Sequence, residues 1–85
     1  MTYKLVYTHR AIKDVQNLDP AIKKRIGKAL LRLEKDPFAH SKRLVDSNLG
    51  TYRFRIGDYR VIYDIQGEDI VILRIGHRNS IYRTI

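Results

Sequence analysis

The dipeptide Gly57-Asp58, which separates two runs of alternating apolar and polar residues, is the feature that most constrains the fold. A two-residue loop that begins with glycine is typical of a type II′ turn between adjacent antiparallel strands. The sequence therefore predicts a β-hairpin with strands at roughly 50–56 and 59–65. So short a loop also fixes the register, because a slip of one residue would move every side chain to the opposite face of the sheet.

In this register the hairpin has one apolar face and one cationic face. Residue 56 pairs with 59, 55 with 60, 54 with 61, 53 with 62 and 52 with 63. The face predicted to lie on the core carries Tyr52, Phe54, Ile56, Tyr59, Val61 and Tyr63. The opposite face carries Arg53, Arg55 and Arg60. Like charges directly across a strand pair destabilise it by up to about 1 kcal/mol. This face is therefore either a set of well-solvated guanidinium groups or a phosphate-binding site, and we favour the second, because the guanidinium fork matches phosphate bidentately.

Two amphipathic helices are predicted in the N-terminal half, after a short strand at 2–7. Thr8 can cap the first helix, whose apolar residues recur at helical spacing. Asp19 and Pro20 suit the N-cap and the first position of a second helix, which is expected to end at Asp36-Pro37. Residues 38–49 are expected to form a loop, with a possible short strand near 43–45.

A third strand of the C-terminal half is predicted at 70–75, after a turn at the sequence "QGED". The element order is then β-α-α-β-β-β. We predict an α+β fold in which the two helices pack on one face of a mainly antiparallel sheet and leave the other face free for function. With 85 residues, the chain is expected to form a single domain, 1–85.

The position of Arg74 depends on the length of that second turn. A two-residue loop at 67–68 would place Arg74 on the core side, whereas a three-residue loop at 67–69 would place it with the other arginines. In the second case the residues facing the core would be Val71, Leu73 and Ile75. Because burial of an unpaired charge is costly, we favour the three-residue loop. Gly76 and Arg78 are then expected on the same face of the sheet as these arginines.

The chain is strongly basic, with 17 Lys and Arg against nine Asp and Glu and a net charge of +8. Residues 1–43 hold eleven of these cations and four of the acids. This excess favours an anionic partner, either nucleic acid or an acidic protein, although a solvated helix face equally accounts for the helical lysines. Because the chain has no cysteine, no membrane-length apolar run and no secretion signal, we expect a soluble cytoplasmic protein without a membrane partner.

The acids lie mostly at predicted caps and turns, and the histidines lack metal-ligand spacing, so we expect no metal or other cofactor. RNA carries its own nucleophile, the 2′-hydroxyl, and can be cleaved by alignment, positive charge and two proton transfers. Charge could come from Arg53, Arg55, Arg60 and Arg78. Because guanidinium keeps its proton, Tyr82 and His77 are the candidate proton carriers. For both, a purely structural role is the alternative: packing on the sheet for Tyr82 and a hydrogen bond at the strand end for His77.

The predicted element order, with the segments "YRFRIGDYRVIYDI" and "LRIGHRNSIYR", resembles the RelE/ParE toxin superfamily over nearly the whole chain. The RelE branch consists of ribosome-dependent endoribonucleases. The resemblance thus implies a toxin of a type II toxin–antitoxin system that cleaves mRNA in the ribosomal A site and inhibits translation. A ParE-like inhibitor of DNA gyrase without RNase activity is the main alternative. A member that only binds its antitoxin or nucleic acid is another.

The resemblance also implies roles for individual residues. Arg53 and Arg55 match two basic residues, often lysines, that precede the turn, and Arg60 matches the arginine that follows it. Arg78 matches the arginine after the last strand, and Tyr82 matches the tyrosine of the tail. The implied catalytic residues are Arg60, Arg78, Tyr82 and His77, and the implied RNA-binding residues are Arg53, Arg55 and Arg74. Since no lysine stands at 53 or 55, the general base is left between Tyr82 and His77.

The partners that the resemblance implies are a cognate antitoxin, the ribosome with its mRNA, and operator DNA bound only through the toxin–antitoxin complex. In this superfamily an antitoxin segment, often helical, wraps the toxin and covers or distorts the basic site. The net charge of +8 predicts that this segment is acidic and amphipathic.

Overall fold

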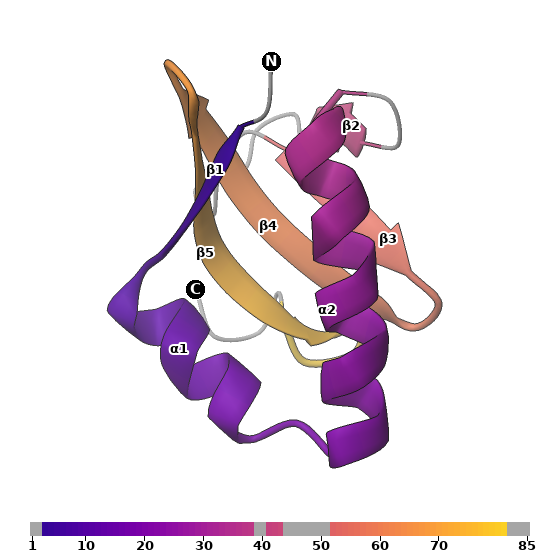
Figure 1. Cartoon of the computed structure of the whole chain (residues 1–85). Coiled ribbons are helices and arrows are strands. Elements are labelled where there is room, and N and C mark those ends of the chain that lie inside the picture. Colours follow the sequence, from indigo (N-terminus) through magenta and orange to yellow (C-terminus); the bar gives the residue numbers. More distant parts are fainter. Residues whose placement is uncertain (1–2, 39–40, 44–51, 82–85) are drawn as a thin grey trace.

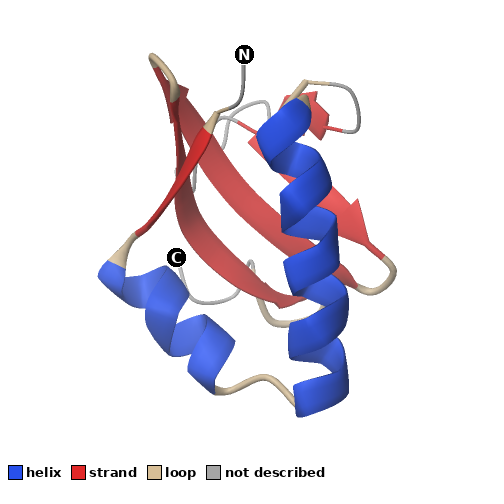
Figure 2. Cartoon of the chain, viewed as in Figure 1, coloured by secondary structure: helices blue, strands red, loops and turns tan. Residues whose placement is uncertain are grey.

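The computed structural model describes residues 3–38, 41–43 and 52–81 of the chain. Its elements, in chain order, are β1 (Lys4–Tyr7), α1 (His9–Gln16), α2 (Pro20–Lys35), β2 (Ser41–Arg43), β3 (Tyr52–Ile56), β4 (Tyr59–Gln66) and β5 (Asp69–His77). The strands form one sheet in the order β1-β5-β4-β3-β2, with β1 parallel to β5 and the other pairs antiparallel. Both helices lie on the same face of this sheet (Figures 1 and 2). The predicted α+β fold is therefore confirmed.

The short strand predicted near 43–45 lies slightly earlier in the chain, as β2, and pairs with β3 at the edge of the sheet. Residues 44 and 45 are outside the described residues. The sheet thus has one strand more than the predicted order of elements. Neither helix among the described residues combines the length and apolar character needed to cross a membrane.

The predicted helix boundaries are confirmed, but one of the predicted caps is not. The Thr8 hydroxyl accepts a hydrogen bond from the backbone N–H of Ala11 at 3.2 Å and so caps α1. Asp19 occupies the N-cap position of α2 with Pro20 at the first turn, yet its side chain makes no capping hydrogen bond. The extended backbone of Asp19 and the fixed φ of Pro20 therefore start α2 without help from the carboxylate. The helix ends at Asp36, as predicted.

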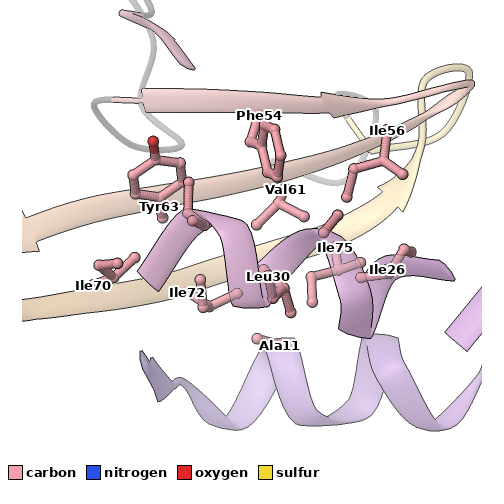
Figure 3. Packing of buried hydrophobic residues seen from close by; sticks show 12 residues of the cluster. Ala11, Ile26, Leu30, Phe54, Ile56, Val61, Tyr63, Ile70, Ile72 and Ile75 are labelled. Atoms are coloured by element: carbon pink, nitrogen blue, oxygen red, sulfur yellow. The ribbon is translucent and has the colours of Figure 1, made fainter. Parts of the chain in front are cut away.

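The core lies between the two helices and the sheet (Figure 3). Its members from the helices are Ala11, Ile26, Ala29, Leu30 and Leu33. Its members from the sheet are Phe54, Ile56, Val61, Tyr63, Ile70, Ile72 and Ile75. Fully burying one such side chain contributes about 1.5–3 kcal/mol, so this cluster dominates the stability of the chain. The buried phenol of Tyr63 donates a hydrogen bond to the carbonyl oxygen of Pro37 and so ties the sheet to the end of α2.

The predicted register of the hairpin is confirmed at all five pairs, from Tyr52 with Tyr63 to Ile56 with Tyr59. Gly57 has a φ of +58°, as the first central residue of a type II′ turn requires. Phe54 and Val61 are buried on the helix side, and Arg55 lies opposite Arg60.

The favoured register of β5 is wrong. Gln66 pairs with Asp69, so the second turn is the two-residue loop at 67–68, with Gly67 at a φ of +63°. A β-bulge then interrupts the ladder, because Tyr63 pairs with Ile72 whereas the preceding Ile62 pairs with Arg74. The core residues of β5 are accordingly Ile70, Ile72 and Ile75 instead of Val71, Leu73 and Ile75. The bulge shifts the alternation by one residue, and Arg74 is thereby kept out of the core despite the short turn.

Beyond the end of β1, α1 and its cap form hydrogen bonds with the free edge of β5. β1 pairs with β5 only as far as Ile72. Beyond that point the Thr8 hydroxyl lies 2.8 Å from the carbonyl oxygen of Ile72 and 3.2 Å from that of the bulged Leu73. The backbone N–H of Ile75 donates to the Asp14 carboxylate at 3.0 Å. Side chains of α1 and its cap therefore satisfy the backbone groups that the bulge leaves without a strand partner.

The sheet face opposite the helices is not left entirely free, contrary to the prediction. Ile62, which pairs with Arg53 and Arg74 on that face, has no exposed surface. Ile81 is also buried, and a Cβ at Gly76 would lie 3.5 Å from its Cβ. The segment after β5 thus folds back over part of this face and leaves the rest of it to the arginines.

We expect Gly67→Ala to lower the free energy of unfolding by about 1–2 kcal/mol, because the left-handed backbone is unfavourable for residues with a Cβ. No atom lies within 4 Å of the added methyl group, so the loss would report the backbone alone. Urea unfolding of this variant, with Glu68→Ala as the control, measures the effect. Wild-type stability of Gly67→Ala would show that the turn does not hold this conformation in solution.

Candidate phosphate-binding site

The arginine face is the side of the sheet opposite the helices, and we define it by Arg53, Arg55, Arg60 and Arg74. Two rows of paired residues cross it. One row runs from Arg53 through Ile62 to Arg74, and the next runs from Arg55 through Arg60 to Gly76. Because directly paired residues point to the same side of a sheet, the register brings these arginines together as predicted.

Arg60 is the most rigidly held of the predicted site residues. Its side chain is buried, with 5% of the residue exposed. One terminal nitrogen donates to the carbonyl oxygen of Gly57 at 2.9 Å and to that of Tyr59 at 3.0 Å. The hairpin turn therefore fixes the guanidinium group in one position through two backbone carbonyl groups.

Arg53 and Arg55 supply positive charge that is accessible to solvent. Arg55 is exposed and Arg53 is half-buried. Within the described residues, neither side chain forms an ion pair with a carboxylate. A guanidinium group without such a partner retains its donors for an incoming anion, and its planar fork fits two phosphate oxygens.

Arg74 lies on the same face, but an acidic residue of α1 holds its guanidinium group. The Nε of Arg74 is 2.8 Å from the Asp14 carboxylate, and the two side chains are 13% and 12% exposed. Asp14 also accepts from the backbone N–H of Ile75. The charge of Arg74 is therefore largely compensated, which makes it a weaker phosphate ligand than Arg53 or Arg55.

Arg78, in the segment after β5, is held at the hairpin turn. Its backbone N–H donates to the carbonyl oxygen of Asp58 at 2.8 Å, and its Nε lies 3.8 Å from the Asp58 carboxylate. Both side chains are more than half exposed, so water screens this ion pair and leaves the guanidinium group able to reorient. The Gly57-Asp58 turn consequently anchors both Arg60 and Arg78.

His77 is directed away from the arginine face. It pairs with Tyr59, which packs against the core, and the two rings meet edge to face with centroids 5.5 Å apart. Its Nδ1 accepts a hydrogen bond from the backbone N–H of Asn79 at 3.1 Å. This is the geometry of the structural alternative considered for His77, a hydrogen-bonded histidine at a strand end. Tyr82 is outside the described residues.

Arg25 of α2 is a cation near the site that the sequence analysis did not single out. A Cβ at Gly57 would lie 2.7 Å from a terminal nitrogen of Arg25, so its guanidinium group covers the hairpin turn from the helix side. Three arginines from separate elements, Arg25, Arg60 and Arg78, thus meet at this turn. Helical spacing places Arg25 on an outward face of α2, but no local pattern indicates that it reaches residue 57.

Asp14 is the second residue whose role was missed. It follows the basic residues Arg10 and Lys13 in an amphipathic helix, where an acid is usually a solvent-exposed side chain. Its partner, Arg74, is 60 residues away in the chain. The only signal available was the need of any half-buried arginine on β5 for an acidic partner.

Comparisons with known proteins give a consistent relationship. Residues 5–82 match the family described as the ParE toxin of the type II toxin–antitoxin system parDE. Toxin RelG of Mycobacterium tuberculosis is 36% identical over 86 residues, which cover 98% of this chain and 99% of RelG. Toxin RelE3 of Methanocaldococcus jannaschii is 26% identical over 83 residues, with 93% and 94% of the two chains covered.

Solved structures extend this relationship to the fold. A chain of the toxin–antitoxin complex RelBE2 of Mycobacterium tuberculosis superposes with a TM-score of 0.83 at 31% identity, covering 92% of this chain and all of the other. A chain of the archaeal RelE–RelB complex of Pyrococcus horikoshii gives a TM-score of 0.76 at 30% identity, with 94% and 99% covered.

We expect Asp14→Asn to lower the free energy of unfolding by about 2–3 kcal/mol, because it removes the negative charge that lies 2.8 Å from the poorly exposed Arg74. Arg10→Ala is the matched control, since Arg10 lies 4.0 Å from the same carboxylate but is 56% exposed. Its loss should cost less than about 0.5 kcal/mol. Equal effects of the two substitutions in chemical denaturation would contradict the assignment of Arg74 as the main partner of Asp14.

Proposed function

This chain belongs to the ParE toxin family of type II toxin–antitoxin systems, and on that premise we propose that it is a RelE-like endoribonuclease. In this proposal it enters the ribosomal A site and cleaves mRNA without a metal ion, which inhibits translation. The observation that carries the proposal is the pair of accessible arginines, Arg53 and Arg55, beside the fixed Arg60. The names of the relatives, RelG and RelE3, favour the RelE branch over the ParE branch.

In the proposed reaction the 2′-oxygen of one nucleotide attacks the adjacent phosphorus. A bond forms between them while the bond from phosphorus to the 5′-oxygen breaks, which leaves a 2′,3′-cyclic phosphate and a 5′-hydroxyl group. Negative charge builds on the phosphate oxygens in the transition state. Arg60, already held by two carbonyl groups, and the adjustable Arg78 would stabilise this charge, while Arg53 and Arg55 bind the strand.

Two protons must move, one from the attacking 2′-hydroxyl and one to the leaving 5′-oxygen. Arginine cannot carry either of them. His77 packs on Tyr59 on the far side of the sheet, so we assign the first proton transfer to Tyr82. A guanidinium group beside a phenol favours the phenolate form, so an approach of Tyr82 to the arginines would make it a better base. With no strong base at hand, the enzyme would depend on the ribosome to hold the mRNA in the reactive geometry.

The proposed partners follow from the same site. We propose a cognate antitoxin with an acidic, amphipathic segment, and association with operator DNA only through the toxin–antitoxin complex. The structural relative RelBE2 is itself a toxin–antitoxin complex. The second candidate function is inhibition of DNA gyrase, because the matching family carries the name of ParE.

We expect wild-type protein to produce codon-phased cuts in a defined mRNA during translation, detected by primer extension, and none in the same mRNA without ribosomes. Arg78→Ala should reduce cutting by about 100-fold or more, the usual effect of removing a group that stabilises transition-state charge. Arg32→Ala, which removes an exposed arginine of α2, is the matched control and should cut like wild type. Absence of cuts together with inhibited gyrase supercoiling would favour the ParE-like function.

The proton carriers can be separated by paired substitutions. We expect Tyr82→Phe to lower the cleavage rate by at least about 100-fold, as loss of a general base does. His77→Gln should stay within about threefold of wild type, because glutamine can still accept the hydrogen bond from Asn79 and the ring lies off the arginine face. Single-turnover cleavage on stalled ribosomes measures both rates, and the opposite ranking would make His77 the base.

A further inference from the structure

The hairpin turn is covered on its helix side by an arginine that the proposed reaction does not use. A Cβ at Gly57 would lie 2.7 Å from one terminal nitrogen of Arg25, 3.2 Å from its Cζ and 3.4 Å from the other terminal nitrogen. The guanidinium group of Arg25 therefore lies against the backbone of the turn. Figure 1 shows the turn between β3 and β4 beside α2, the helix that carries Arg25.

Gly57 brings the guanidinium groups of Arg25 and Arg60 close together. Arg25 lies at the Cβ position of Gly57, and Arg60 donates to the carbonyl oxygen of the same residue at 2.9 Å. Standard backbone geometry separates these two points of one residue by about 3 Å. A terminal nitrogen of Arg25 therefore lies within about 9 Å of a terminal nitrogen of Arg60. The glycine thus serves both the turn conformation and this approach.

The charge of Arg25 is not neutralised by any residue that the structure describes. Arg25 is exposed, and within the described ranges its guanidinium group has neither an ion pair nor a hydrogen bond. Asp58, the acid of the turn, lies 3.8 Å from Arg78 instead. Like charges as close as those of Arg25 and Arg60 repel one another even in water. An apolar side chain at position 25 would cover the turn without this repulsion.

An anion explains what packing alone does not. The five N–H donors of Arg25 are available to an incoming ligand, and the planar fork suits two oxygens of a phosphate. The separation from Arg60 suits two neighbouring phosphates of one strand, each of which accepts from a different guanidinium group. Contacts of this kind fix the register of a nucleic acid without reading its bases.

We propose that Arg25 is a further RNA-binding residue, which binds the phosphate of the mRNA strand next to the scissile one. The inference rests on the proposed function, because it takes Arg60 as the residue at the scissile phosphate. The strand then crosses the tip of the hairpin, from the arginine face to the helix side. Arg25 holds it there while Arg60 and Arg78 act on the reacting group.

Arg32 provides the matched control on the same helix. It is also exposed, and it follows Arg25 by seven residues, which is two helical turns and about 10 Å along the axis. It therefore lies on the same side of α2, away from the hairpin turn. Comparison of the two positions separates the loss of any helical cation from the loss of the cation at the turn.

The first test measures binding of a fluorescently labelled single-stranded RNA to the free toxin by anisotropy at several salt concentrations. We expect Arg25→Leu, which can still cover the turn, to weaken binding about threefold to tenfold. It should also lower the slope of log affinity against log salt by about 0.7, which corresponds to one phosphate contact on a single strand. Arg25→Lys should restore the slope, and Arg32→Ala should stay within twofold of wild type.

The second test identifies the phosphate in the ribosomal cleavage assay. The phosphates that flank the cleaved bond are replaced, one at a time, by neutral methylphosphonates. At one of the two positions the replacement should slow wild type about fivefold and leave Arg25→Leu unchanged, because the variant already lacks the partner.

An RNA affinity and a salt slope of Arg25→Leu equal to those of wild type would overturn the proposal. Methylphosphonate effects of equal size in both proteins at both positions would also overturn it, and a weakened affinity for ribosomes would then assign Arg25 to ribosomal RNA. Weakened RNA binding by Arg25→Leu with no cleavage by wild type would refute only the endoribonuclease. Normal cleavage by wild type and by Arg25→Leu, with equal RNA binding, would refute only the role of Arg25.

Discussion

The two-residue turn at Gly57-Asp58 is the constraint on which the rest of the structure depends. It sets the hairpin register, and the register sends Phe54 and Val61 into the core while it brings Arg55 opposite Arg60. The same turn supplies carbonyl groups that hold Arg60 and Arg78. Repulsion between the arginines destabilises the hairpin, but burial of the opposite face offsets it. The free energy gained by burying one core side chain is larger than the destabilisation caused by one pair of like charges.

The hairpin could be predicted from the sequence because a tight turn makes register a local property. β5 could not, because its position depends on contacts with a distant helix. At the bulge after Ile72, where β1 has ended, the Thr8 hydroxyl donates to the backbone of β5 and the Asp14 carboxylate accepts from it. A prediction from loop length alone therefore gave the wrong core residues in β5. Arg74 nevertheless lies outside the core, as expected from the cost of burying a charge.

The candidate site divides in the same way. Arg53, Arg55 and Arg60 follow from the turn and the alternation of the strands. Alternation should also have separated His77 from them, because residues 76 and 78 were already assigned to the arginine face and 77 lies between them. Arg25 and Asp14 reach their places through the packing of α2 and α1 on the sheet, which no single stretch of sequence records.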